Sequence, residues 1–163
     1  MKTVHVLVAN SDRRLNNLIE VAVRDVCYEQ VLVECETTCR LDEAIHQGCV
    51  KEFGLIFLAP DHVVIGPPQR ASSARMEDAT RAIRTIKEHR SVPIIGVGVK
   101  PHEEPLLLEA GANHVFGILF DRDKLRAEIR LALGLRELIE EPEPTRWSLT
   151  GGLLRGLQKF RQS

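Results

Sequence analysis

Five short runs of Val, Ile, Leu and Ala recur along this 163-residue chain and constrain its fold more than any other feature. Each run is short and almost free of polar residues, which is typical of strands buried on both faces of a sheet. The predicted strands span residues 4–9, 31–35, 53–59, 92–99 and 114–119.

A segment with apolar residues at helical spacing follows each predicted strand. The predicted helices span residues 12–27, 41–50, 77–89, 103–110 and 121–138. Residues 60–74 contain several Pro and Gly residues, so we expect a long polar connection there. Alternation of strands and helices favours right-handed crossovers. We therefore expect an α/β fold, with a five-stranded parallel sheet covered by helices on both faces.

The composition excludes several classes of protein. The formal net charge is -1, so no overall positive field would attract nucleic acid, and we expect no nucleic-acid partner. No apolar run reaches the roughly 18 residues of a membrane span, and the chain opens directly into a strand-like segment. These features favour a cytoplasmic protein.

Four cysteines occur in the first third of the chain, and a reducing compartment would keep them as free thiols. Cys35 and Cys39 are close in sequence, but no further paired Cys or His residues complete a zinc-binding motif. We expect no metal and no cofactor.

Four segments carry a resemblance to a known family. They are VLVANSDRRLNNLI, FGLIFLAPD, VPIIGVGVK and AGANHVFGILFDRDKLRAEI. The last segment is the most specific. Together they resemble the receiver domain of bacterial response regulators, over about residues 3–136. The resemblance implies a flavodoxin-like (CheY-like) fold.

The family's phosphorylation residues are absent at the matching positions. A receiver accepts a phosphoryl group on an aspartate at the end of its third strand, where this chain has Ala59. The Mg²⁺-binding acids correspond to Asn10 and Ser11, the hydroxyl of the fourth strand to Gly98, and the lysine of the fifth strand to Ile118. The resemblance therefore implies a degenerate pseudo-receiver that is not an enzyme.

Two acids lie close to the vacant positions and leave a relocated site open. Asp12 follows Ser11 by one residue and Asp61 follows Ala59 by two, with Lys100 on another loop. The structural interpretation is that Asp12 caps a helix and Asp61 forms a turn.

A second alternative is a flavodoxin-like protein that binds a small ligand in the crevice at the carboxyl ends of the strands. A third is a small hydrolase that uses His62 or His102 as a general base, against the interpretation of both as solvated loop residues.

By resemblance, the chain would bind a signalling or regulatory protein, or form a homodimer, through its fourth helix, fifth strand and fifth helix. The candidate residues are Glu104, Leu108, His114, Phe116, Arg122, Lys124 and Arg126.

The last residues form a separate unit in the sequence. We divide the chain into a receiver-like domain, residues 1–140, and a linker with a short amphipathic basic tail, residues 141–163. Apolar residues of the tail lie at helix-like spacing, so it would pack on its own domain, bind a partner or contact an anionic membrane. They are Trp147, Leu153, Leu154, Leu157 and Phe160.

Overall fold

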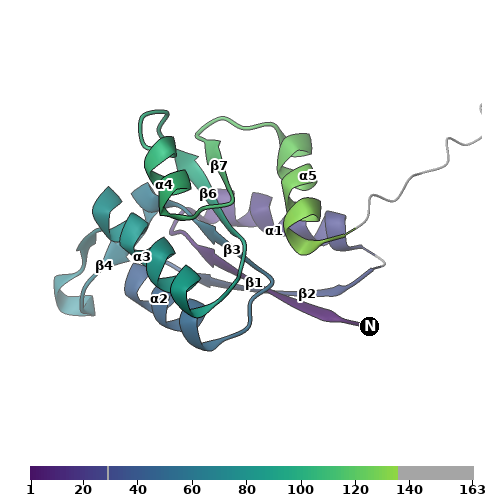
Figure 1. Cartoon of the computed structure of the whole chain (residues 1–163), viewed down its shortest axis with the longest axis horizontal. Helices are drawn as coiled ribbons and strands as arrows, with labels where there is room; N and C mark the ends of the chain where they lie inside the picture. The colour runs from purple at the N-terminus through teal and green to yellow at the C-terminus, as the bar shows by residue number, and fades with distance from the viewer. Residues whose placement is uncertain (29, 136–163) are drawn as a thin grey trace, which may run out of the picture.

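Each predicted apolar run forms a strand of one parallel sheet. The computed structural model describes residues 1–28 and 30–135. The strands of the sheet are β1 (Thr3–Ala9), β2 (Leu32–Thr38), β3 (Leu55–Leu58), β6 (Ile94–Val99) and β7 (His114–Gly117). Their spatial order is β2-β1-β3-β6-β7 (Figure 1). Ala9 is opposite Thr38 of β2 and Leu58 of β3, so the carboxyl ends of these strands meet at one edge.

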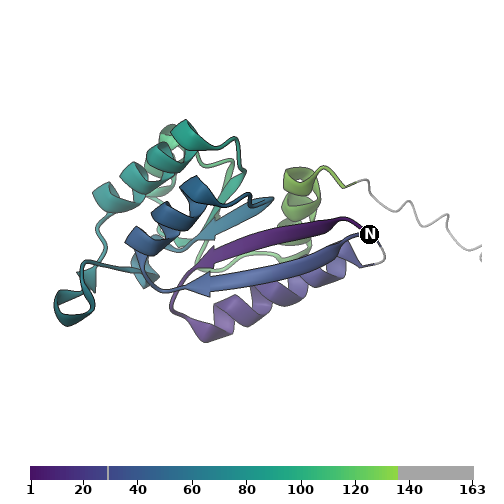
Figure 2. The same cartoon turned by 90° about the horizontal axis from the view of Figure 1, so that it is seen from below.

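Among the described residues, five α-helices cover the two faces of the sheet. They are α1 (Arg13–Cys27), α2 (Leu41–Val50), α3 (Met76–His89), α4 (Glu104–Ala110) and α5 (Arg122–Leu133). Helices α1 and α5 share one hydrophobic cluster with the sheet, and α2, α3 and α4 share the other. Figure 2 shows α1 on one side of the strands and α2 with α3 on the opposite side. The expected α/β architecture is confirmed.

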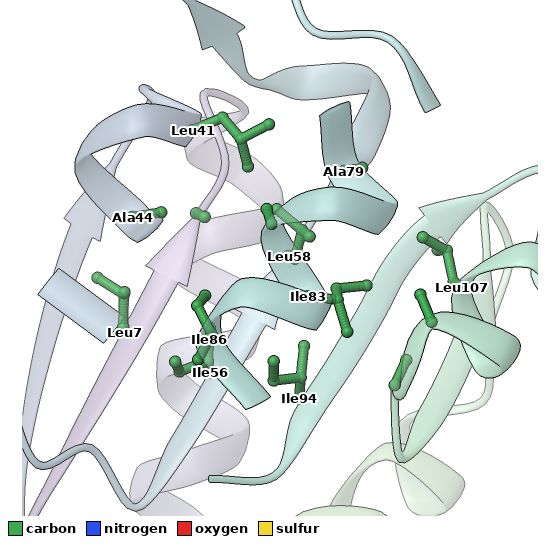
Figure 3. Close-up of a cluster of buried hydrophobic side chains, with 14 of the residues drawn as sticks. Leu7, Leu41, Ala44, Ile56, Leu58, Ala79, Ile83, Ile86, Ile94 and Leu107 are labelled. Atoms are coloured by element: carbon green, nitrogen blue, oxygen red, sulfur yellow. The ribbon is translucent and has the colours of Figure 1, made fainter. Parts of the chain in front are cut away.

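Aliphatic side chains fill the layer between the sheet and helices α2, α3 and α4 (Figure 3). Ile56 and Ile94 from the strands lie with Ile83 and Ile86 from α3 and Leu107 from α4. All of these side chains are buried. Ile83 and Ile86 therefore form the face of α3 that packs on the sheet.

The carboxyl-terminal ends of three elements lie two or more residues from their predicted positions, and β3 and β6 each begin two residues later than predicted. Strand β2 continues to Thr38, because its polar last residues still pair with β1. Strand β7 ends at Gly117, so Ile118 lies past the strand rather than in it. Helix α5 ends at Leu133, because Gly134 adopts a left-handed conformation, with φ of 63°, that caps the helix. Leu138 lies outside the described residues.

The polar connection contains ordered structure that the sequence analysis missed. It forms the 3₁₀ turns Pro60–His62 and Pro68–Arg70 and an antiparallel pair, β4 (Val64–Ile65) with β5 (Ser72–Ser73). Val63 is buried in the cluster of α2, α3 and α4, which attaches this hairpin to the domain. Strands of two residues carry no periodicity that a sequence can reveal.

The remaining expectations from the sequence concern the cysteines, a membrane-spanning helix and the tail. The four cysteines are free thiols. No helix among residues 1–28 and 30–135 is both long and apolar enough to cross a membrane. The tail residues from 141 onward, with Trp147, lie outside the part of the chain that the structure describes.

Candidate functional site

A crevice of about 520 Å³ opens at the carboxyl ends of the strands. Loops that follow β1, β3, β6 and β7 form it, as expected for an open parallel sheet. Its lining residues are Asp12, Leu15, Asp61, His62, Gly98, Lys100, Ile118 and Phe120. The structure thus brings four of the predicted pocket residues together, while the side chains of Asn10 and Ala59 are buried behind the crevice.

Asn10 is a structural residue at the start of the first loop. Its side chain is buried, with 2 % of the residue exposed. The side-chain amide donates to the Asp12 carbonyl oxygen (3.1 Å) and to Oδ1 of Asn16 (2.9 Å), and its own Oδ1 accepts from the Asp12 amide (3.1 Å). The loop therefore uses both the donor and the acceptor of a neutral amide.

Asp12 caps helix α1. Its Oδ1 accepts hydrogen bonds from the backbone amides of Arg14 (2.9 Å) and Leu15 (3.4 Å). This geometry confirms the capping role, because it satisfies amides at the helix start that have no partner within the helix. The carboxylate still lines the crevice.

The loop after β1 is bonded to the loop after β3. The amide of Ser11 donates to the carbonyl oxygen of His62 at 2.8 Å. The hydroxyl-bearing residue Ser11 itself is exposed. A main-chain contact therefore fixes the two loops to each other, and this contact does not depend on the side chain of Ser11.

Ala59 occupies the end of the third strand and is fully buried, at 0 % exposure. Its amide donates to the Ala9 carbonyl oxygen (3.0 Å), and its carbonyl oxygen accepts from the His62 amide (3.1 Å). Its methyl group belongs to the hydrophobic cluster of α1 and α5. The position therefore contributes apolar packing and no reactive group.

Gly98 lies on an irregular stretch of β6. It has a φ of +65°, and the pairing of β6 with β7 shifts register between Gly96 and Val99. A residue with a Cβ atom is strained in this left-handed region, and a β-branched residue most of all. The backbone here is therefore suited to glycine rather than to the Ser or Thr of ordinary receivers.

One oppositely charged pair borders the crevice. Nζ of Lys100 lies 3.9 Å from Oδ2 of Asp61, and both side chains are partly exposed, so water screens the attraction. Within the described part of the chain, no group of three His, Cys, Asp or Glu residues could hold a metal ion. A relocated Asp12–Asp61 site would therefore have at most two carboxylates.

Of the two histidines considered as a general base, only one lies at the crevice. His62 lines it, whereas His102 is largely exposed and lies 3.9 Å from Glu103. Apolar side chains complete the lining, since Leu15, Ile118 and Phe120 border the same space. Position 118 of the rim therefore carries an apolar side chain, where ordinary receivers carry a lysine.

Comparison with known proteins identifies the fold. No family model and no curated protein matches the sequence. Among solved structures, the receiver domain of a sensor histidine kinase from Pseudomonas aeruginosa, which has a magnesium ion in its active-site cleft, is 19% identical, with a TM-score of 0.59. That match covers 81% of this chain and 98% of that one.

Two further receivers agree with this match. A putative response regulator from Chloroflexus aurantiacus is 16% identical, with a TM-score of 0.60 over 82% of this chain and 99% of that one. The receiver domain of NtrX from Brucella abortus is 18% identical, with a TM-score of 0.60 over 80% and 99%. The chain has the fold of response regulator receiver domains. The predicted flavodoxin-like (CheY-like) sheet is confirmed.

The predicted interaction residues do not all lie on one exposed face of the receiver fold. Glu104 and Leu108 are exposed on α4, and Lys124 is exposed on α5. His114 lies at the edge of the sheet, 3.5 Å from Glu128. Phe116 is only 5 % exposed, so its inclusion in a docking surface is a correction that the structure requires.

Phe116 is buried because α5 covers its side of the strand. Its ring packs in the cluster of α1 and α5, between His114 (4.5 Å between centroids) and Phe120 (5.6 Å). Alternation along an edge strand does not show which side a helix covers.

Arg122 and Arg126 face α1 rather than α4. Both line a groove between α1 and α5. They lie four residues apart, so they share one side of the helix. Of the predicted residues, Glu104, Leu108, His114 and Lys124 therefore remain candidates for the face of α4, β7 and α5.

Two residues that line the crevice were not predicted from the sequence. Leu15 lies in the first turn of α1, and Phe120 is the second residue after Ile118. Their proximity to predicted pocket positions is a signal, but both are apolar residues of a kind that core packing explains equally well.

Proposed function

We propose that this chain is a receiver-like domain that binds a signalling or regulatory protein in bacteria without being phosphorylated. One observation carries the proposal: the residue at the end of the third strand is Ala59, whose side chain is buried among apolar groups. A methyl group can neither accept a phosphoryl group nor bind Mg²⁺.

The rest of the crevice agrees with this proposal. A carboxylate at position 10 would lose the two hydrogen bonds that the Asn10 amide donates. The neutral side chain of Ile118 stands where receivers carry a cation, and a cation there would have no phosphoryl group to neutralise. Loss of the acids removes the need for the lysine, because an unpaired charge is costly in an apolar site.

The surface for the partner, or for a second copy of the chain, would be the face of α4, β7 and α5. Leu108 is exposed there beside the charged Glu104 on the same helix, and Leu106 adds a second exposed apolar side chain. An apolar centre with a charged surround is typical of protein interfaces. We expect this module to act in the cytoplasm and to bind no nucleic acid. Any contact with a membrane would involve the tail, residues 141–163.

Incubation with Mg²⁺ and acetyl phosphate, followed by measurement of the intact mass, tests the central claim. We expect no phosphoryl adduct, whereas an ordinary receiver treated in parallel should acquire one. We also expect none with Ala59→Asp, because the Mg²⁺-binding acids and the lysine are still missing. A stoichiometric adduct on the natural chain, mapped to Asp12 or Asp61, would replace the proposal with a relocated phosphorylation site.

A matched pair of variants tests the surface. Leu108→Arg places a charge in the exposed apolar centre of the proposed face, whereas Val50→Arg makes the same change at an exposed site on α2. We expect Leu108→Arg to abolish capture of the natural partner, or self-association in sedimentation equilibrium. The Val50→Arg variant should behave like the natural chain. Equal behaviour of the two variants would exclude this face.

A second candidate function, binding of a small ligand, has one observation in its favour. The crevice combines the apolar side chains of Leu15, Ile118 and Phe120 with the charged pair of Asp61 and Lys100. Such a combination is typical of ligand sites. A ligand that raises the Tm of the natural chain but not of Phe120→Ala would support this function, and a panel without any such ligand would count against it.

A further inference from the structure

The proposed function leaves a groove between α1 and α5 without a role. The two helices lie side by side and share one hydrophobic cluster with the sheet (Figure 1). The groove has a volume of about 320 Å³. Leu18, Val21 and Ala22 of α1 supply its apolar lining, and Arg14, Arg122 and Arg126 supply its charges, together with Asn17. Its lining therefore carries three positive charges and no acid.

The groove has unused binding capacity in the described part of the chain. Val21 is 56 % exposed although it is a large apolar residue. Within the described residues, Arg14 and Arg122 take part in no ion pair, while Arg126 contacts Asp25 (3.0 Å) and Asp123 (3.5 Å). The Nε atom of Arg126 is buried and has no acceptor among the described residues. An occupant with both acidic and apolar side chains would satisfy these groups.

The chain itself supplies such a segment. Residues 137–143 read ELIEEPE and combine four glutamates with Leu138 and Ile139. This stretch begins four residues after α5 ends at Leu133. We propose that residues 137–143 dock in the groove between α1 and α5, with the glutamates against the arginines and Leu138 or Ile139 against Val21.

The end of α5 directs the chain toward this side of the sheet. Gly134 is left-handed, and the amide of Leu135 donates to the Arg130 carbonyl oxygen at 2.9 Å, which turns the chain back across the helix end. Leu135 then packs against the hydrophobic cluster of α1 and α5, not against the cluster on the opposite face.

The segment is long enough to reach all three arginines. From Leu133 back to Arg122, α5 rises about 16 Å at about 1.5 Å per residue. Seven extended residues span about 23 Å at about 3.3 Å per residue. Pro142 favours an extended backbone in the residue before it. A short tether also raises the effective concentration to roughly the millimolar range, so weak charge pairs suffice for docking.

Nuclear magnetic resonance of the full-length chain at low salt tests the proposal. We expect contacts between the methyl groups of Val21 and those of Leu138 or Ile139. Glu140→Lys combined with Glu141→Lys should lower the ratio of docked to undocked chain roughly tenfold, since two charge pairs become repulsions. The amide resonances of α1 and α5 that border the groove should shift accordingly.

Two further variants separate docking from a general effect of charge. Glu77→Lys combined with Glu88→Lys changes the net charge equally at exposed sites of α3 and should leave the contacts intact. Arg14→Glu combined with Arg122→Glu should weaken docking in the otherwise natural chain. The same two changes should restore docking when they are added to the Glu140→Lys and Glu141→Lys variant, because the charges of the groove and the segment are then exchanged. Groove resonances that do not differ between the natural chain and the Glu140 and Glu141 variant would overturn the proposal.

A mixed sample of two isotopically distinct chains identifies the occupant. Contacts within one chain are expected. Contacts between two chains would overturn the intramolecular arrangement and assign the groove to a second copy. Groove resonances that respond only to an added acidic peptide would overturn it in favour of a partner protein. These outcomes do not depend on the phosphorylation assay, so this inference and the proposed function can fail separately.

Discussion

Asn10 and Asn16 hold the first loop of the crevice through a reciprocal pair of hydrogen bonds. The side-chain amide of Asn10 donates to Oδ1 of Asn16 at 2.9 Å, and the side-chain amide of Asn16 donates to the Asn10 carbonyl oxygen at 3.1 Å. This pair connects the end of β1 to the second turn of α1. A neutral amide, rather than an acid, is therefore built into the loop where receivers bind Mg²⁺.

Replacement of this amide by a carboxylate should destabilise the domain. We expect Asn10→Asp to lower the free energy of unfolding by about 1–3 kcal/mol, because a buried oxygen would then face Oδ1 of Asn16 and the Asp12 carbonyl oxygen without a proton to share. Urea unfolding monitored by circular dichroism measures the change. Gln69→Glu, the same change of amide to carboxylate at an exposed site in the connection after β4, should change the stability by less than about 0.5 kcal/mol. Equal losses in the two variants would contradict the role of Asn10.

The sequence predicts the fold well because of how the sheet is buried. All four residues of β3 are buried, so the strand reads as an uninterrupted apolar run. The ends of elements are harder to predict because they depend on backbone geometry. Polar residues at the end of β2 still pair with β1, and α5 ends where Gly134 turns left-handed rather than where the apolar spacing ends.

The candidate site could be predicted only in part. The resemblance located Ala59 and Gly98, since both follow recognisable strands, but not the positive φ of Gly98. The resemblance also placed Phe116 and Arg126 on a docking face. Neither the packing of α5 over Phe116 nor the contact of Arg126 with Asp25 of α1 is a local property of the sequence. Both depend on how helices from distant parts of the chain meet.

The conformation of Gly98 predicts that the hydroxyl residue of ordinary receivers cannot be restored without strain. Gly98→Thr should cost about 1–2 kcal/mol of stability or more, because a φ of +65° is disfavoured for a residue with a Cβ atom. Thermal or urea unfolding measures the loss.

Gly117→Ala is the control for Gly98→Thr. Gly117 does not have a positive φ, and an added Cβ atom there would approach no other atom closer than 3.7 Å. This variant should retain more stability than Gly98→Thr, and the reverse order would show that the backbone at Gly98 relaxes at little cost.

The aliphatic cluster in Figure 3 predicts a large effect from truncation of one side chain. Ile83 of α3 is fully buried within it, so Ile83→Ala should lower the free energy of unfolding by about 2–5 kcal/mol through lost burial and a residual cavity. Leu131→Ala on α5 should change it by less than about 0.5 kcal/mol, because that side chain is exposed. Urea unfolding of the two variants should separate them clearly, and similar values would place α3 outside the stable core.

The cysteines should differ in their reactivity toward iodoacetamide. Burial raises the pKa of the Cys35 thiol to about 11, with a further rise from the nearby Glu20 carboxylate and an opposing effect of Arg24. Burial also raises the pKa of Cys27. The thiolate is the nucleophile, so at pH 8 only roughly one Cys35 side chain in a thousand is reactive. We expect peptide mass spectrometry to detect alkylation of the exposed Cys39 well before that of Cys35.

The dependence of this reaction on pH separates the effect of the pKa from that of simple shielding. A raised pKa means that the Cys35 rate should climb about tenfold per pH unit from pH 8 toward pH 11, as the thiolate fraction grows. The same shift in pKa affects stability, because the folded state holds the Cys35 proton more tightly than the unfolded state does. This stabilising contribution is complete below the ordinary pKa of 9.0 and declines as the pH rises toward 11. Cys35→Ser should therefore show a smaller loss of stability over that interval than the natural chain. A Cys35 rate that already equals that of Cys39 at pH 8 would show that this thiol is not desolvated in solution.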